Sequence, residues 1–307
     1  MITIYKNIEN NLVAIPEPMV GSWINVVKPT PEETACLIEL GIPHDYITYS
    51  LDIDERARTE REDGEQLILL RVSYFKGQTA DIPFITLPLG IILTDHYIVT
   101  ICQEENDVLQ EMSRLKDLST VKRNRFVLRL LLRVATRYLN HLNQITKSVD
   151  ALEDQLQLST RNKEVLELLK YQKSLTLFTT ALKSHELMMK RLQQSQMFRE
   201  YEEDLDLLED VLTETQQAID TTNIASNILS SMMDAFASII SNNLNGVMKF
   251  LASITIVVSL PTMIASFYGM NVSLPFADHP LAFLGTAALA IIVTTVVGII
   301  FWRRDWL

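Results

Sequence analysis

The sequence predicts a cytoplasmic α/β domain followed by a long helical segment and two C-terminal transmembrane helices. Three observations lead to this fold class: β-rich runs fill the first hundred residues, Gly and Pro are absent from Ser119 up to Gly246, and two apolar runs end the chain. The chain has 307 residues and is 48% apolar, a high share for a soluble protein. Because the excess gathers near the C-terminus, it indicates membrane spans.

The N-terminal part of the chain, residues 1–118, is predicted to be an α/β domain. Its β-rich runs are NNLVAIPE, GSWINVVKP, EQLILLRVSYF and GIILTDHYIVTIC, and the last contains a polar turn at Thr94 to His96. Between these runs, TPEETACLIELG predicts a short helix with a complete set of start and stop signals. These signals are the N-cap Thr30, Pro31 in the first helical position, Glu33 of the capping box and Gly41 at the end.

From residue 119 the pattern becomes helical, with Leu at three- and four-residue spacing. Breaks near Ser159 to Asn162 and near Met197 to Tyr201 predict a long α-helical hairpin over 119–200. The stalk helix over 201–245 then continues into the membrane. The stalk and the first membrane span would form one continuous helix about 100 Å long. Its heptad-like apolar positions predict packing against copies of itself or against the hairpin. They are Leu205, Leu208, Leu212, Ile219, Ile224, Ile228 and Met232.

The two apolar runs predict transmembrane helices at 246–268 and 281–302. The first run contains one charged residue, Lys249, and the second contains none, so each reaches the roughly 20 residues needed to cross hydrocarbon. Residues 269–280 form the loop between them, and 303–307 form a basic tail. A pair of such runs in series would be unusual inside a soluble domain.

Basic residues predict the orientation of these helices. Lys249 lies at the entrance to the first span, Arg303 and Arg304 follow the second, and the loop between has neither Lys nor Arg. The N-terminal residues mix charged and polar side chains with apolar ones, unlike a signal peptide. We therefore expect a multi-pass protein of the cell membrane with both termini in the cytoplasm and the loop outside.

Catalysis has no support in the sequence. The five His are scattered, and the HExxH, GxSxG and P-loop patterns are absent. Cys36 and Cys102 lack CxxC spacing, and in a reducing compartment they are expected to be buried thiols. We expect neither an enzyme nor a nucleic-acid-binding protein.

Polar and small residues recur along one face of the first span, here called the polar stripe. Two series with seven-residue spacing, offset by three, share this face of a helix. They are Asn245, Ala252, Ser259 and Ser266, and Met248, Thr255, Thr262 and Gly269. Several copies around an axis would line a water-filled pore, where such groups can be hydrated. The alternative is close helix packing, since small residues let helix backbones approach in lipid. Ser253 lies off the stripe.

The segment from Glu200 to Met248 contains ten acidic residues and no Lys or Arg. Such a run is most often a solvated helix face, which we expect for Glu202, Glu203 and Asp204. In a symmetric oligomer, however, carboxylates recur around a common axis and repel unless cations lie between them. Oxygen ligands select hard cations such as magnesium or calcium. A neighbouring subunit could supply partner carboxylates from the LDIDER segment, namely Asp52, Asp54 and Glu55.

The YGMN motif at Tyr268 to Asn271 follows a first span that contains a proline, and a short loop, a second span and the tail RRDWL come after it. With this arrangement the chain resembles the CorA family of divalent-cation transporters over its whole length. The resemblance implies a funnel-shaped homopentamer. It also implies a pore lined by the first span of each subunit, with the Gly-Met-Asn loop at the outer mouth.

The resemblance further implies roles for single residues. The selectivity filter would be Gly269, Met270 and Asn271: Gly269 lets the chain turn sharply, Met270 packs, and Asn271 amides meet the ion. The pore-lining residues that the resemblance implies would be Asn245, Met248, Leu251, Ser259, Thr262 and Ser266. Thr255, which lies on the polar stripe, is a seventh pore-lining candidate. Asp210 would hold a regulatory ion that bridges to a neighbouring subunit, with Asp52, Asp54 and Glu55 as candidate partners. The loop departs from the family's MPEL pattern and keeps Asp278 as its only acid.

We therefore expect a magnesium uptake channel that is driven by the membrane potential and closed by cytoplasmic magnesium bound between subunits. Magnesium dehydrates reluctantly, so a ring of neutral amides that binds the hydrated ion suits conduction. A divalent ion gains about 4.6 kcal/mol per 100 mV, so no ATP site is required. The expected partners are other copies of the chain, divalent ions and the bilayer. Two alternatives stay open: transport of cobalt, nickel or zinc, and a non-conducting membrane-anchored sensor or scaffold.

Overall fold

The computed structural model describes residues 1–307 except 9–10, 63, 117, 159–161, 195–196, 199–200, 271–279 and 307. The chain divides into two units, residues 1–232 and 233–307. Helix α6 (Glu202–Tyr268) contributes residues to both.

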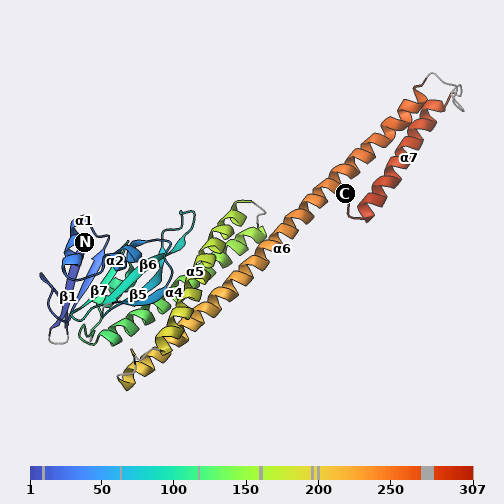
Figure 1. The fold of residues 1–307 in the computed structure, drawn as a ribbon. Helices are drawn as coiled ribbons and strands as arrows, with labels where there is room; N and C mark the ends of the chain where they lie inside the picture. The colour runs from blue at the N-terminus through green and yellow to red at the C-terminus, as the bar shows by residue number, and fades with distance from the viewer. Residues whose placement is uncertain are drawn as a thin grey trace. The chain divides into compact units, whose positions relative to one another are not determined.

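A seven-stranded mixed sheet forms the centre of the first unit (Figure 1). Its strand order is β2-β1-β3-β7-β6-β5-β4, and β3 and β7 are its parallel neighbours while the other pairs are antiparallel. The predicted turn at Thr94 to His96 separates β6 from β7. The strands are β1 (Ile2–Ile8), β2 (Asn11–Ile15), β3 (Ser22–Val27), β4 (Arg58–Glu62), β5 (Glu65–Phe75), β6 (Phe84–Leu93) and β7 (Tyr97–Cys102). Of these, β1 and β4 were not predicted.

The central strands are apolar on both faces because helices cover both. In β5, Leu67 and Leu69 belong to a core cluster that also contains Tyr46 and Ile47 of α2 (His44–Leu51). The neighbouring residue Ile68 is equally buried, on the opposite face of the pleated strand. Helices α4 and α5 contact β5 and β6 as well, so the sheet lies between two layers of helix.

Helix α1 (Pro31–Glu39) confirms the predicted capping box, since Thr30 Oγ1 accepts from the Glu33 amide and Glu33 accepts from the Thr30 amide. Gly41 follows with φ of 89°, a left-handed conformation that favours glycine. The expectation of a buried Cys36 is wrong: α1 buries only Leu37, and Cys36 is exposed on its outer face, whereas Cys102 is buried. Helices α2 and α3 (Asp107–Ser113) were not predicted.

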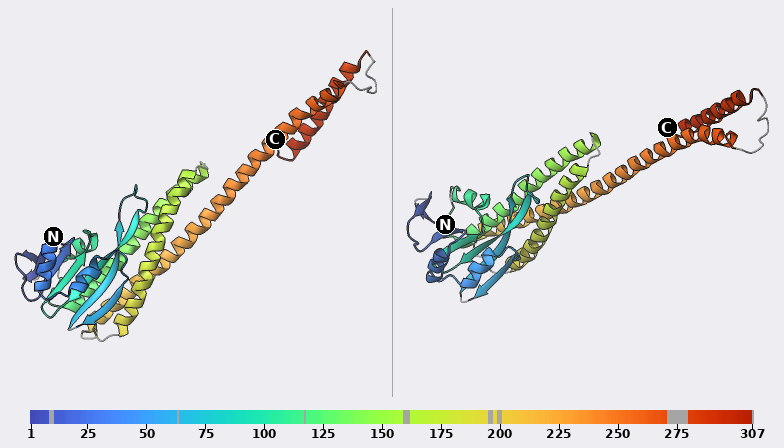
Figure 2. Two further views of the ribbon diagram at one scale, coloured as in Figure 1. Left: turned by 45° about the horizontal axis from the view of Figure 1, so that its top comes forward. Right: turned by 90° about the horizontal axis from the view of Figure 1, so that it is seen from above.

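The predicted helical hairpin is α4 (Arg123–Leu158) and α5 (Asn162–Gln194), which run side by side in Figures 1 and 2. Aromatic contacts fix the hairpin on the sheet: Trp23 meets Phe126 at 5.1 Å and Phe84 meets Phe178 at 6.4 Å between ring centroids. Helix α6 contacts α5 as well, since Gln172 Nε2 donates to Ser230 Oγ at 3.2 Å.

The first unit's part of α6 is only partly packed on the preceding helices. Of the predicted heptad positions, Leu208 and Ile219 are buried, whereas Leu205, Ile224 and Ile228 are exposed. The expectation of a solvated Asp204 is wrong. Its side chain is buried because it accepts from Arg125 Nε of α4 at 2.7 Å, and Glu203 pairs with the same guanidinium.

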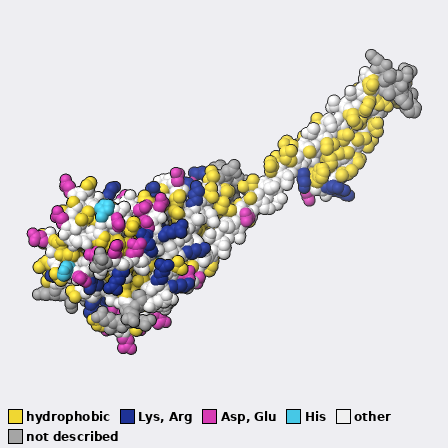
Figure 3. Space-filling model, in the orientation of Figure 1, with side chains coloured by type: hydrophobic (Ala, Val, Ile, Leu, Met, Phe, Trp, Pro, Cys, Tyr) yellow, Lys and Arg dark blue, Asp and Glu magenta, His cyan; other side chains and the backbone are white. Residues whose placement is uncertain are grey.

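In the second unit, the rest of α6 runs beside α7 (Ala282–Arg303) in every view (Figures 1 and 2). Both helices are long and apolar enough to cross a membrane. Figure 3 shows apolar side chains over most of this unit's drawn face, with Lys and Arg gathered at one end. Arg303 ends α7 and Arg304 caps it, so the apolar helix passes directly into the basic tail.

Candidate ion pathway and regulatory site

One face of α6 in the second unit is covered. Ser253 is fully buried and donates to the Lys249 carbonyl at 2.7 Å, and Val257, Leu260 and Ile264 on the same face are partly buried. Helix α7 lies alongside, and most of its partly buried positions carry small side chains. These are Ala282, Thr286, Ala287, Ala290, Thr294 and Gly298. Ser253 on α6 and these small residues on α7 therefore lie on the partly covered faces of two helices that run side by side.

The polar stripe lies on the uncovered part of α6. All seven candidate pore-lining residues are exposed. A groove runs along this part of the helix, and Thr255, Ser259, Thr262 and Ser266 line it together with apolar neighbours such as Val258. The stripe and the α7-facing residues therefore occupy different faces of the same helix.

The stripe hydroxyls are oriented by their own helix. Thr255 donates to the Leu251 carbonyl at 2.8 Å, Ser259 to Ile256 at 2.9 Å and Thr262 to Val258 at 3.3 Å. Each hydroxyl proton is thereby used, while the oxygen keeps lone pairs that can accept from water. A row of acceptors suits the hydrogens of a hydrated cation.

The end of α6 carries the GMN motif. The Gly269 amide donates to the Ala265 carbonyl at 3.0 Å and the Ser266 carbonyl at 3.2 Å, and its φ is not left-handed. Gly269 directly follows the last residue of α6, and the chain is described only as far as Met270, so the sharp turn expected at Gly269 stays a prediction. Met270 is exposed. Asn271 lies outside the described residues.

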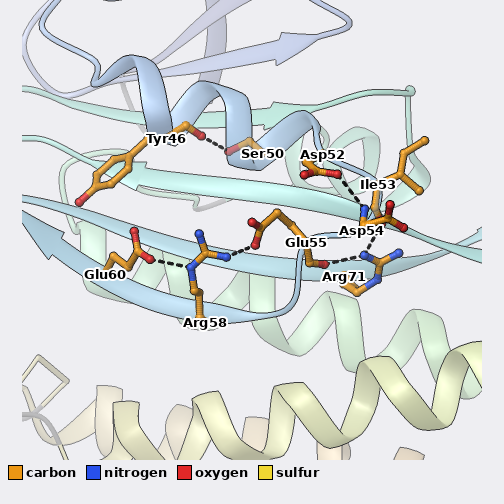
Figure 4. Close-up of polar contacts among 9 residues, drawn as sticks. All are labelled: Tyr46, Ser50, Asp52, Ile53, Asp54, Glu55, Arg58, Glu60 and Arg71. Atoms are coloured by element: carbon orange, nitrogen blue, oxygen red, sulfur yellow. Dashed lines mark hydrogen bonds and ion pairs between the residues drawn. The ribbon is translucent and has the colours of Figure 1, made fainter.

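The acidic segment that follows α2 contains Asp52, Asp54 and Glu55 (Figure 4). Asp52 Oδ1 accepts from the Asp54 amide at 3.0 Å, and both Asp side chains are exposed. The Glu55 carboxylate instead pairs with Arg58, whose guanidinium also donates to Glu60 Oε1 at 2.6 Å. Glu55 thus already has an ion-pair partner, and Asp52 and Asp54 are the better candidates for an ion.

Arg71 of β5 holds this segment in place, a role that no local pattern in the sequence predicts. One terminal nitrogen donates to the carbonyls of Ile53 and Glu55, each at 2.6 Å (Figure 4). Nε and the other terminal nitrogen donate to Thr86 Oγ1 at 3.0 Å and the Thr86 carbonyl at 2.9 Å. Burial lowers the pKa of Arg71, and the charges of Asp54 and Asp52 oppose that shift.

The backbone of Arg71 is bound by the helical hairpin. Its amide donates to His185 Nε2 of α5 at 3.0 Å, and its carbonyl accepts from the Tyr138 hydroxyl of α4 at 2.8 Å. Nearby, His141 Nδ1 lies 2.9 Å from Ser73 Oγ. Burial lowers the pKa of both His141 and His185 to about 4, helped by the charges of Arg137 and Arg71 respectively. Both imidazoles are therefore neutral near pH 7.

Asp210, the stalk candidate, is exposed on α6 and has no hydrogen bond or ion pair with any described residue. Within the part of the chain that the structure describes, no three His, Cys, Asp or Glu side chains are grouped to hold a metal ion. The hypothesis for Asp210 and Asp52 requires two subunits, and each chain carries half of such a site.

Comparison with known proteins identifies the family. Residues 20–304 match the family described as CorA-like Mg2+ transporter protein. The cobalt/magnesium transport protein CorA of Methanocaldococcus jannaschii is 30% identical over 297 residues, covering 93% of this chain and 91% of the relative. A magnesium transport protein CorA of Helicobacter pylori is 21% identical, covering 93% of this chain and 90% of its own.

The fold agrees with a solved structure of the same kind. The complete structure of the CorA magnesium transporter from M. jannaschii matches with a TM-score of 0.86 at 23% identity, over 100% of this chain and 99% of that one. The domain order, the stalk helix and the two C-terminal membrane helices are therefore those of CorA proteins. This chain belongs to the CorA family of divalent-cation transporters and is a membrane protein, not an enzyme.

Proposed function

We propose that the chain is one subunit of a homopentameric magnesium uptake channel in which the polar stripe of α6 lines the pore. The observation that carries this proposal is the division of α6 into two faces. Ser253 and its neighbours are covered on the side of α7, whereas the stripe is exposed. The stripe hydroxyls donate to carbonyls of their own helix, so their oxygens can still accept hydrogen bonds. Polar groups at membrane depth are stable when they line a water-filled path, and five such faces around an axis supply one.

At the outer mouth, Gly269, Met270 and Asn271 form the selectivity filter in this proposal. Asn271 amide oxygens accept hydrogen bonds from the waters of the arriving ion, which therefore keeps its hydration shell. Neutral oxygens bind weakly enough to release the ion again. The inside-negative membrane potential then drives uptake.

On the cytoplasmic side, magnesium bound between subunits closes the channel. Asp210 of one stalk and Asp52 or Asp54 of a neighbour are the proposed ligands, because all three carboxylates are exposed and Asp210 has no partner among the described residues. Glu55 is a weaker candidate since it already pairs with Arg58. Release of the ion leaves the acidic stalks to repel one another and opens the pore.

Both termini face the cytoplasm in this proposal, because Lys249, Arg303 and Arg304 flank the spans on one side. In a Cys-free background, an impermeant thiol reagent added outside should label Ala277→Cys and leave Asp45→Cys unlabelled. The reverse pattern would invert the topology and remove the stalk from the cytoplasm.

Accessibility of the stripe tests the pore directly. Thr262→Cys, in a Cys36→Ser and Cys102→Ala background, should react with a small charged thiol reagent, and the reaction should block magnesium flux into proteoliposomes. Ile256→Cys, which lies off the stripe on the same helix, is the matched control and should leave flux unchanged. Equal block at both positions would reject the stripe as the pore lining. An unmodified protein without any flux would favour a sensor or scaffold.

Cobalt is the second candidate ion, because the M. jannaschii relative is named a cobalt/magnesium transport protein. The stripe offers oxygen acceptors and no His or Cys, which favours hard, hydrated ions over zinc. Flux of magnesium, cobalt and nickel measured separately in the same proteoliposomes ranks the ions.

A further inference from the structure

Arg71 occupies a position where the sheet cannot complete its own hydrogen bonds. Pairing of β4 with β5 ends at Arg58 opposite Leu69, so Arg71 lies beyond it. On the other side, Arg71 is opposite Pro88 of β6, but the amide and carbonyl of a strand residue point to the same neighbour, and those of Arg71 point away from β6. His185 and Tyr138 of the helical hairpin bind the Arg71 amide and carbonyl instead. At Arg71, both backbone polar groups of the strand therefore bind the hairpin.

The side chain of the same residue holds the acidic segment. By the alternation of the strand, Arg71 shares the face of Leu67 and Leu69, on which α2 packs. Its guanidinium spans Thr86 on β6 and the carbonyls of Ile53 and Glu55, and this uses the planar fork of donors that only Arg provides. The backbone between Asp52 and Glu55 is thus held at two points.

We propose that Arg71 is a positioning residue that couples the Asp52 to Glu55 segment to helices α4 and α5. The regulatory part of this inference rests on the proposed function, in which Asp52 and Asp54 receive magnesium. An ion that moves this segment would pull on the Arg71 side chain. Because the Arg71 backbone is bound by His185 and Tyr138, the displacement passes to the hairpin without an intervening flexible linker.

Arg71 also affects the ion electrostatically, and the test must separate the two effects. The carboxylates of Asp52 and Asp54 interact with the Arg71 charge, which competes with an arriving cation. Neutral substitutions would remove the competing charge and the two carbonyl bonds together. Arg71→Lys keeps the charge but cannot bridge two carbonyls and Thr86, so it isolates the positioning role.

The experiment is hydrogen exchange of the full chain in detergent, with and without magnesium, for the parent, Arg71→Lys and the control Arg133→Lys. Arg133 lies on α4 and pairs with Glu111 at 3.9 Å on the surface, so the control makes the same substitution without a buried contact. In Arg71→Lys we expect exchange within 53–56 to rise by at least about tenfold. We also expect the magnesium concentration for half-protection of 52–57 to rise at least about fivefold, and the response around His185 to disappear.

Two results would overturn the inference, and they are distinguishable. Unchanged exchange at 53–56 in Arg71→Lys would reject Arg71 as the positioning residue, whatever magnesium does. Loosening in Arg71→Lys, with no magnesium response of 52–57 in the parent, would keep the mechanical link and reject the regulatory role. Should Arg71→Lys fail to fold, Thr86→Val removes only the Thr86 hydroxyl contact, and it should move the same midpoint in the same direction by a smaller factor.

Discussion

Polar groups in the two units have different partners. In the first unit, buried groups bond across long stretches of sequence: Trp23 Nε1 donates to Thr100 Oγ1 at 2.8 Å, and the Phe84 amide donates to Ser174 Oγ at 3.3 Å. In the second unit, the hydroxyls of Thr255 and Thr262 bond to carbonyls one turn earlier in their own helix. The first arrangement joins elements, whereas the second joins nothing beyond the helix.

This difference separates polar groups that stabilise the fold from polar groups that remain available to a ligand. A buried group whose partner is removed loses its hydrogen bond and stays desolvated, which costs about 1–3 kcal/mol. An exposed hydroxyl bonded to its own helix loses little when it is removed. Substitutions in the first unit should therefore change stability, and substitutions in the stripe should change transport.

The largest predicted effect is the loss of stability at low pH, which should come from buried His residues of the first unit and not from the stripe. His141 and His185 have a pKa of about 4 in the folded chain against an ordinary value of 6.5, so the unfolded chain binds more protons below pH 6.5. The contribution of these two imidazoles to stability should be constant above about pH 7 and should fall between pH 6.5 and pH 4, by up to about 3 kcal/mol for each His. Denaturant unfolding of the full chain in detergent measures it.

The control replaces the imidazole by a group that does not titrate. His185→Gln keeps an acceptor for the Arg71 amide, and its stability should depend less on pH over the same interval. A parent and variant with the same pH profile would show that His185 is not a neutral structural acceptor. The stripe contains no titratable residue, so it makes no contribution to this profile.

The second prediction concerns transport. Asn271→Ala should lower magnesium uptake into proteoliposomes to near background, by at least about 100-fold, because it removes the amide acceptors at the mouth. Ser273→Ala in the same loop is the matched control. Wild-type uptake in Asn271→Ala would move selectivity to the stripe, with Thr262 and Asn245 as the next positions to test.

The third prediction compares one hydroxyl from each unit. Tyr138→Phe leaves the Arg71 carbonyl without its donor and should cost about 1–3 kcal/mol of unfolding free energy. Thr262→Val removes a stripe hydroxyl of similar size to the new methyl and should cost less than about 0.5 kcal/mol while lowering flux. Equal stability losses would break the distinction between the two units.

Much of this architecture follows from local signals in the sequence. The capping box at Thr30 and Glu33, the turn after β6 and the two apolar helices each depend on neighbouring residues. Strand β4, with the sequence RTERE, was not predicted because an edge strand needs no apolar residue. Strand β1 was not predicted because Lys6 and Asn7 interrupt its alternation.

The candidate site divides in the same way. The stripe could be found from spacing alone, because a helix places residues seven apart on one face. Arg71 could not, since its partners Tyr138 and His185 are 67 and 114 positions away. Asp204 was misjudged for the same reason, because its partner Arg125 is 79 positions away. Contacts at such separations depend on the tertiary fold.

The smallest effect should come from a pair of carboxylates on one helix, Asp204 and Asp210. Asp204 is buried against Arg125, whereas Asp210 is exposed with no partner among the described residues. By the same distinction between partnered and available polar groups, Asp204 has a structural role and Asp210 is a candidate ligand.

Asp210→Ala should change the free energy of unfolding by less than about 0.5 kcal/mol. It should raise the magnesium concentration that protects the stalk from protease at least about fivefold, since one coupled ligand contributes about 1–3 kcal/mol. Glu202→Ala, another exposed acid on α6, is the control. Coincident magnesium midpoints for Asp210→Ala, Glu202→Ala and the parent would make Asp210 one more solvated carboxylate and leave the stripe as the functional feature of α6.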